Sequence, residues 1–128
     1  MSAAPQPLIL VVEDDADVCS VLCIFLEDMQ HRVAIANELS TGAEILENLN
    51  PALLIVDIML QGGNGNDLAR LARVKNIPVL LMSGDLKSIE RLQEKNTPFL
   101  QKPFRLSELE EWVKKLLPTH DNKTPKAF

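Results

Sequence analysis

The segment LLIVD, residues 53–57, places one carboxylate at the end of four consecutive branched apolar residues. Pro51 precedes this segment, and a glycine-containing loop, residues 58–65, follows it. An unbroken apolar run this short is typical of a strand buried on both faces, as in the middle of a parallel sheet. Open α/β sheets bind ligands outside the carboxyl ends of their strands. Asp57 therefore stands where such a fold usually places its chemistry.

Four other segments share the strand pattern, and segments with helical periodicity lie between them. The expected strands are residues 8–12, 32–36, 53–57, 77–82 and 99–102. The expected helices are residues 16–30, 40–49, 66–74, 86–95 and 106–117. The alternating pattern at 32–36 suits a strand at a sheet edge. This order predicts an α/β fold, a doubly wound five-stranded parallel sheet with five helices and right-handed crossovers.

Two helix starts carry capping signals. Asp14, Asp15 and Asp17 lie near the start of the first helix, where acidic side chains favour the helix dipole and can cap free amides. Ser107, with Glu110 three residues later, has the spacing of a capping box. We therefore expect the last helix to begin at Ser107 or just before it.

The chain has the length of one domain. Its 128 residues are 46% hydrophobic, which suffices for a core without disulfides or a structural metal. We expect an N-terminal extension over residues 1–6, one globular unit over 7–117, and a polar, disordered tail over 118–128. Cys19 and Cys23 do not complete a zinc site, and we interpret them as reduced, small apolar residues.

The overall charge restricts the classes of direct partner. A net charge of -5 argues against nucleic acid or an anionic membrane, both of which need clustered basic residues, but leaves a basic protein surface open. No apolar run approaches the roughly 20 residues that span a bilayer, and the first residues do not resemble a signal peptide. We therefore expect a cytoplasmic protein.

The carboxyl ends of the expected strands bring several functional side chains to one edge of the sheet. These residues are Glu13, Asp14, Asp57, Ser83 and Lys102. Three neighbouring carboxylates repel one another, and a hard divalent ion such as Mg²⁺, with a phosphate completing its shell, relieves that repulsion. Lys102 supplies a positive charge for phosphate oxygens, Ser83 a hydroxyl donor, and Gly84 leaves room beside them.

Asp57 can act as a nucleophile in this arrangement, because aspartate carboxylates form aspartyl-phosphate intermediates. The metal and Lys102 would neutralise the charge of the transferring phosphoryl group. No residue stands out as a strong base that activates water. Without such a base we expect a phosphoryl group that stays on Asp57, and not one that is hydrolysed rapidly.

Four separated motifs resemble the receiver domain of two-component response regulators, in order and at suitable spacing. They are VVEDD at 11–15, DIML at 57–60 with the glycines that follow, MSG at 82–84 and KPF at 102–104. The resemblance covers residues 7–117 and implies a flavodoxin-like strand order 2-1-3-4-5. It also implies a switch, in which a histidine kinase or histidine phosphotransfer protein passes a phosphoryl group to Asp57.

The resemblance also implies roles for single residues at this edge. Glu13, Asp14, Asp57 and the backbone carbonyl of Met59 would hold Mg²⁺. The phosphoryl group would be bound by Ser83, Gly84 and Lys102.

A second set of implied roles concerns switching. Phe99 matches the switch aromatic of the family, which moves inward when Ser83 moves to the phosphate. The peptide bond before Pro103 would be cis. Gln61 departs from the family pattern, which usually has proline there, and Asn96-Thr97 replace the common Gly-Ala before the aromatic strand. These departures leave the chemistry intact.

Two other functions fit parts of the pattern. A Mg²⁺-dependent phosphatase of the haloacid-dehalogenase type also uses an aspartate nucleophile, but it normally needs a second aspartate two residues later, where this chain has Met59. A receiver-like interaction module that works without phosphorylation would not need three carboxylates that repel one another. We therefore expect a protein that catalyses only its own phosphorylation and slow dephosphorylation.

Two surfaces are candidates for protein contacts. Cys19, Cys23 and Ile24 lie outside the main apolar stripe of the first helix, which then either packs on two sides or presents an apolar face to a partner. We hypothesise that they contribute to a kinase-docking face. No further domain follows residue 117, so we expect a stand-alone receiver that contacts an unknown downstream protein. The output face would comprise helix 86–95, the strand with Phe99, and the last helix.

Overall fold

The five aliphatic segments form one parallel sheet. The computed structural model describes residues 6–117, so the expected tail over 118–128 and most of the N-terminal extension lie outside the described residues. The sheet order is β2-β1-β3-β6-β7. The strands are β1 (Leu8–Val12), β2 (Arg32–Ala36), β3 (Leu53–Asp57), β6 (Val79–Ser83) and β7 (Phe99–Gln101). This order is 2-1-3-4-5 among the sheet strands, which confirms the predicted flavodoxin-like topology.

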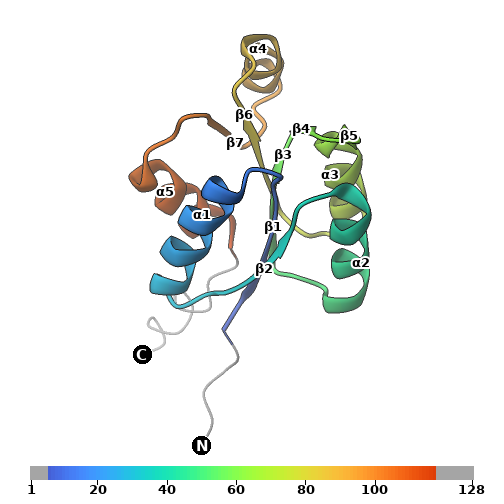
Figure 1. Ribbon diagram of the computed structural model, residues 1–128. Helices are drawn as coiled ribbons and strands as arrows, with labels where there is room; N and C mark the ends of the chain where they lie inside the picture. Colours follow the sequence, from blue (N-terminus) through green and yellow to red (C-terminus); the bar gives the residue numbers. More distant parts are fainter. Residues whose placement is uncertain (1–5, 118–128) are drawn as a thin grey trace, which may run out of the picture.

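Five helices cover the two faces of the sheet. They are α1 (Ala16–Asp28), α2 (Leu39–Leu49), α3 (Gly65–Val74), α4 (Leu86–Glu94) and α5 (Leu106–Leu116). Figure 1 shows α1 and α5 on one face of the sheet, α2 and α3 on the other, and α4 beyond the upper end of the strands. None of the helices within residues 6–117 is both long and apolar enough to cross a membrane.

The alternation of side chains along each strand divides the core in two. One core lies beneath α2 and α3 and includes Leu10, Val56 and Leu81, together with Leu92 from α4. The other lies beneath α1 and α5. All five residues of β3 are buried, as expected for a central strand with helices on both sides. Strand β2 lies at the sheet edge, as its weaker pattern predicts.

Several local features differ from the sequence prediction; helix α1, for example, ends at Asp28 and not at residue 30. Strand β6 begins at Val79, two residues later than expected, and Pro78, which has no N–H to donate, precedes it. A two-stranded hairpin, β4 (Met59–Leu60) and β5 (Gly63–Asn64), lies in the segment expected to be a loop. The last helix begins at Leu106, within the predicted range, but its cap is Arg105, whose backbone N–H donates to Glu108 at 2.9 Å, and not Ser107.

Candidate functional site

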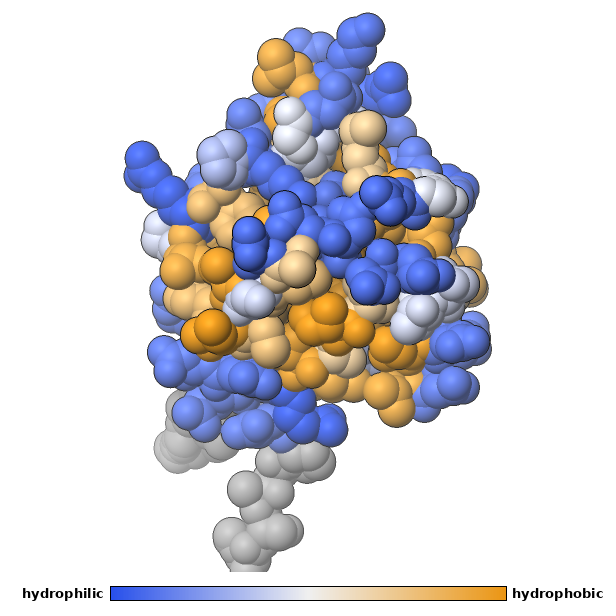
Figure 2. Space-filling model, viewed as in Figure 1, coloured by the Kyte–Doolittle hydropathy of each residue, from blue (hydrophilic) through white to orange (hydrophobic). Residues whose placement is uncertain are grey.

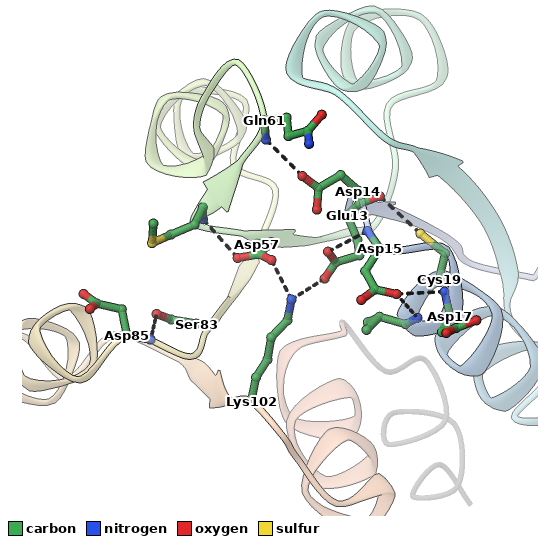
Figure 3. Close-up of polar contacts among 12 residues, drawn as sticks. Glu13, Asp14, Asp15, Asp17, Cys19, Asp57, Gln61, Ser83, Asp85 and Lys102 are labelled. Carbon is green, nitrogen blue, oxygen red and sulfur yellow. Dashed lines mark hydrogen bonds and ion pairs between the residues drawn. The ribbon is translucent and has the colours of Figure 1, made fainter.

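The carboxyl edge of the sheet brings together the side chains that the sequence placed there. Glu13 directly follows β1, Asp57 ends β3, Ser83 ends β6, and Lys102 directly follows β7. Because neighbouring parallel strands end at the same edge, these four residues face a common space although 89 positions separate the first from the last in sequence. Figure 3 shows Lys102 extending toward both Asp57 and Glu13.

Glu13, Asp14 and Asp57 form an acidic cluster. One carboxylate oxygen from each residue lies within 4.8 Å of the others. Glu13 and Asp57 are buried, whereas Asp14 is exposed. Carboxylates this close repel one another, and burial strengthens the repulsion because water no longer screens it.

Lys102 is the cation of this site. Its Nζ lies 2.6 Å from Asp57 Oδ2 and 2.6 Å from Glu13 Oε1. The contact with Asp57 is a hydrogen bond. The contact with Glu13 is an ion pair, and among the described residues Lys102 is the only cation paired with the buried Glu13 Oε1. One ammonium thus faces three carboxylates, which leaves two negative charges uncompensated.

Burial and charge shift two pKa values in this site. Burial raises the pKa of the Glu13 carboxyl above its usual range, and this outweighs the lowering by Lys102 and by the Asp15 backbone N–H. Burial alone would lower the pKa of the Lys102 ammonium, but the carboxylates of Asp57 and Glu13 outweigh it and raise that pKa. The site therefore holds Lys102 in its charged form.

Backbone groups fix the orientation of Asp57. The Met59 N–H donates to Asp57 Oδ1 at 3.0 Å, which leaves Oδ2 for Lys102. The first residue of α3 packs directly against the end of the strand, because the Gly65 N–H donates to the Ile58 carbonyl at 2.8 Å. A Cβ atom on Gly65 would lie 2.1 Å from the Asp57 carbonyl oxygen, so only glycine fits there.

Asp14 is held by a contact that the sequence did not reveal. The Gln61 backbone N–H, at the turn of the β4–β5 hairpin, donates to Asp14 Oδ2 at 3.0 Å. Asp14 and Gln61 lie side by side in Figure 3. The expected helix cap at Asp15 is confirmed, since its side chain accepts from the N–H groups of Asp17 and Val18. Among the acidic residues near the start of α1, Asp15 therefore serves as the helix cap.

Ser83 lies beside the acidic cluster and is turned toward α4. Its side chain is buried, and its Oγ accepts a hydrogen bond of 3.0 Å from the Asp85 N–H. Its carbonyl accepts from the Lys102 N–H at 2.8 Å, which ties β6 to β7 at this edge. A Cβ on Gly84 would meet Lys102 Cβ at 3.7 Å, an ordinary contact. Gly84 is exposed, so the space beside Ser83 is open to solvent.

The remaining candidates surround the site at greater distance. Phe99 is partly buried and lines, with Trp112, a hollow of about 240 Å³. The Lys102–Pro103 peptide bond is cis. Met59 directs an exposed side chain away from the core, and its backbone carbonyl remains a predicted metal ligand.

Helix α1 presents an apolar face beside the site. Ile24 is 70% exposed and Val21 48% exposed. Val21 also lines a groove of about 450 Å³, together with Phe104 and Leu106. The side of the molecule where α1 and α5 lie carries hydrophobic side chains in Figure 2. Cys19 is partly buried, and its thiol donates to the Glu13 carbonyl at 3.2 Å. Of the three residues predicted to lie outside the main apolar stripe, Ile24 is exposed, whereas Cys19 and Cys23 are partly buried. Val21, which the pattern placed in the stripe, is also exposed.

The donor set fits a hard divalent cation. Such ions take oxygen ligands, and three carboxylates at this spacing supply them. Glu13 Oε1 is paired with Lys102 alone among the described residues, so a lone pair on it is available for a metal. A dication would neutralise the two negative charges that Lys102 leaves uncompensated. Glu13, Asp14 and Asp57 are thus suited to hold Mg²⁺.

Comparison with known proteins gives one consistent result. A sequence profile described as "Response regulator receiver domain" matches residues 9–114. The DNA-binding response regulator MtrA of Mycolicibacterium paratuberculosis is 28% identical over 118 residues, which cover 89% of this chain and 52% of that protein. Regulatory protein VanRB of Enterococcus faecalis is 34% identical over 114 residues, which cover 85% of this chain and 51% of that protein.

A solved structure agrees with the sequence matches. The non-phosphorylated HemR receiver domain from Leptospira biflexa superimposes with a TM-score of 0.76 at 28% identity, covering 89% of this chain and 96% of that one. The chain spans about half the length of the curated relatives it matches. One of those relatives is described as DNA-binding, so the expectation that nucleic acid is no direct partner stays a prediction.

Proposed function

The chain belongs to the response regulator receiver domain family of two-component systems, and we propose that Asp57 accepts a phosphoryl group from a phosphohistidine of a histidine kinase or phosphotransfer protein. Receiver domains of this family are phosphorylated on aspartate, bind Mg²⁺ in an acidic pocket and interact with histidine kinases. The observation that carries the proposal is the position of Asp57, whose Oδ2 lies 2.6 Å from Lys102 Nζ beside two further carboxylates.

In the proposed transfer, an Asp57 carboxylate oxygen attacks phosphorus in line with the departing imidazole nitrogen. The P–N bond breaks, the P–O bond forms, and the nitrogen leaves with the electron pair and takes a proton from solvent. Lys102 carries a positive charge that stabilises the equatorial oxygens of the transferring group. Mg²⁺, held by Glu13, Asp14, Asp57 and the Met59 carbonyl, would supply further charge neutralisation. Ser83 and Gly84 would border the bound phosphoryl group.

We propose that residues 7–117 form the switching unit. This unit would catalyse only its own phosphorylation and slow dephosphorylation. In this proposal the carboxylates beside Asp57, those of Glu13 and Asp14, hold the metal and do not activate water. The phosphatase alternative lacks its second acid, because Met59 occupies that position with an exposed thioether. Turnover of a panel of phosphate esters by the purified protein would favour that alternative.

The first test is the intact mass of the protein after incubation with a small phosphodonor. With Mg²⁺ we expect one phosphoryl adduct, and with a metal chelator we expect none. Digestion under conditions that keep the acyl phosphate should locate it in the peptide that contains Asp57. If no adduct forms under any condition, the protein is not a phosphorylated receiver, and a phosphorylation-independent interaction module becomes the better reading.

Docking of the kinase is proposed to use the apolar face of α1, with Cys19, Cys23 and Ile24. We expect Ile24→Glu to slow phosphotransfer from a kinase about tenfold or more, since it places a charge in an apolar contact. Labelling by a small donor should stay unchanged, because Ile24 is 70% exposed and is not part of the acidic cluster. Glu44→Gln, an exposed residue on α2, is the control. Equal slowing with both donors would contradict the docking role.

Output is proposed to involve α4, β7 with Phe99, and α5. Ser83 Oγ accepts from the Asp85 N–H at the start of α4, so movement of Ser83 toward a phosphoryl group would break this contact. Hydrogen exchange measured before and after phosphorylation should change over residues 85–116. Exchange in α2 should not change. Unaltered exchange over 85–116 would show that this surface does not report phosphorylation.

A further inference from the structure

A cleft between α3 and α4 is lined by basic side chains. It has a volume of about 430 Å³. Its charged lining consists of Arg70, Arg73 and one carboxylate, Asp67, from α3, and of Arg91 from α4 with Lys95 at the end of that helix. We refer to it as the basic cleft. It shares no residue with the acidic cluster and only Leu92 with the Trp112 hollow. The site described above therefore does not account for it.

Three of the four cations have no anionic partner. Arg70 pairs with Asp67 on its own helix, and this pair accounts for the one carboxylate that lines the cleft. No carboxylate among residues 6–117 forms an ion pair with Arg73, Arg91 or Lys95, as the five ion pairs of the described residues show. The chain carries 18 acidic residues against 13 basic ones, so carboxylates are plentiful. The cleft is thus a positive region on a negatively charged protein.

The charges of α4 are separated by face. Ser88, Arg91 and Lys95 follow at spacings of three and four, which places them on one face of the helix, and all three line the cleft. Glu90 and Glu94 do not line it. A helix whose charged side chains only contact solvent has no need to place its basic and acidic residues on different faces.

The rest of the lining offers hydrogen bonds and a small apolar floor. Asn64, Asn66 and Ser88 supply amide and hydroxyl groups, and the nearly buried side chains of Ile58 and Leu92 form the floor. Guanidinium groups bind phosphate oxygens in a bidentate manner, and cations facing each other across a hollow favour an anion between them. The volume falls within the roughly 300–1,000 Å³ of small-molecule sites.

We propose that the basic cleft binds a small ligand with two or more phosphate groups, such as a nucleoside di- or triphosphate. The phosphates contact Arg73, Arg91 and Lys95. A nucleoside, where present, reaches the asparagine amides and the apolar floor. This binding does not involve Asp57 and is independent of the phosphotransfer proposed above.

The test is a titration of the full chain, by backbone amide NMR at low ionic strength without divalent metal. The probes are tripolyphosphate, ATP and adenosine. We expect saturable shifts for both phosphate probes at residues of α3 and α4. Equal affinity for tripolyphosphate and ATP assigns binding to the phosphates alone, and tighter binding of ATP assigns a contribution to the nucleoside.

The matched variants are Arg91→Gln/Lys95→Gln in the cleft and Lys114→Gln/Lys115→Gln in the last turn of α5. Both remove two charges near the end of a helix. The cleft variant should weaken the binding of ATP about tenfold or more, and the α5 variant should change it less than about twofold. No saturable binding of either phosphate probe up to about 5 mM, or equal weakening by both variants, would overturn the proposal.

Discussion

Replacement of Asp57 by asparagine is expected to abolish the phosphoryl adduct and to leave the fold in place. The amide has nearly the same shape, and its oxygen can still accept the Met59 N–H that now donates to Oδ1 at 3.0 Å. It is not a nucleophile toward phosphorus, because its nitrogen lone pair is delocalised and it carries no negative charge.

The stability of this variant should change little. The lost attraction to Lys102 is offset by the lost repulsion from Glu13 and Asp14, and Lys102 keeps Glu13 at 2.6 Å. We expect the free energy of unfolding in urea to change by about 1 kcal/mol or less. Intact mass with a small phosphodonor gives the first readout. Asp28→Asn, an exposed carboxylate at the end of α1, is the control and should label like the wild type.

A persisting adduct at wild-type level in Asp57→Asn would show that another residue is the acceptor. A large loss of stability would show that the Asp57 carboxylate is needed for folding, and the labelling result would then need the Asp57→Ala variant for comparison. The two readouts separate a chemical role of Asp57 from a structural one.

Replacement of Lys102 by methionine, in contrast, is expected to destabilise the fold, because it leaves the carboxylates of the site without their cation. It removes the one ammonium between two buried carboxylates and leaves three negative charges within the acidic cluster. Breaking a buried ion pair on one side is strongly destabilising, and we expect a loss of about 3 kcal/mol without divalent metal. Urea unfolding in the presence of a chelator measures this loss.

Mg²⁺ should restore part of the stability of Lys102→Met. A dication that binds only the folded chain stabilises it by mass action, and its attraction is greater where no ammonium competes. Millimolar Mg²⁺ should therefore raise the unfolding free energy of the variant more than that of the wild type. Lys114→Met, which removes an exposed lysine paired with Glu110 on α5, should show no such difference. If Mg²⁺ acts equally on all three proteins, the acidic cluster does not hold the ion.

Much of the fold follows from the sequence because each strand is a continuous apolar segment. Strands β1, β2 and β3 have the predicted bounds, since a polar or charged residue ends each apolar segment. The convergence of Glu13, Asp14, Asp57 and Lys102 follows from the parallel order alone. These parts depend on strand direction and on which residue comes last, and both can be read along the chain.

Contacts made by backbone groups of irregular segments were not predictable in this way. The β4–β5 hairpin pairs only two residues per strand, too few for a periodic pattern, and it positions the Gln61 N–H against Asp14. The capping spacing occurs twice, at Arg105 with Glu108 and at Ser107 with Glu110. Side-chain preference favours serine, but Arg105 is the residue that adopts the extended cap conformation.

The basic cleft was missed for a different reason. Its cations come from two helices, and the last turn of α3 is separated from α4 by strand β6. In the sequence, Arg91 and Lys95 alternate with Glu90 and Glu94, so the segment reads as a mixed-charge helix with few apolar anchors. Only the arrangement of α3 beside α4 shows that the positive faces oppose each other.

The close approach of Gly65 to the Asp57 carbonyl makes α3 a fixed point for experiments that follow the movement of α4. It joins the first turn of α3 to the central strand, backbone against backbone, whereas α4 is anchored by the buried side chains of Ile89 and Leu92 and by the hydrogen bond from Asp85 to Ser83. Local opening follows such differences in anchoring. A pair of spin labels, one on each helix, would therefore record the displacement of α4, with α3 serving as the stationary reference.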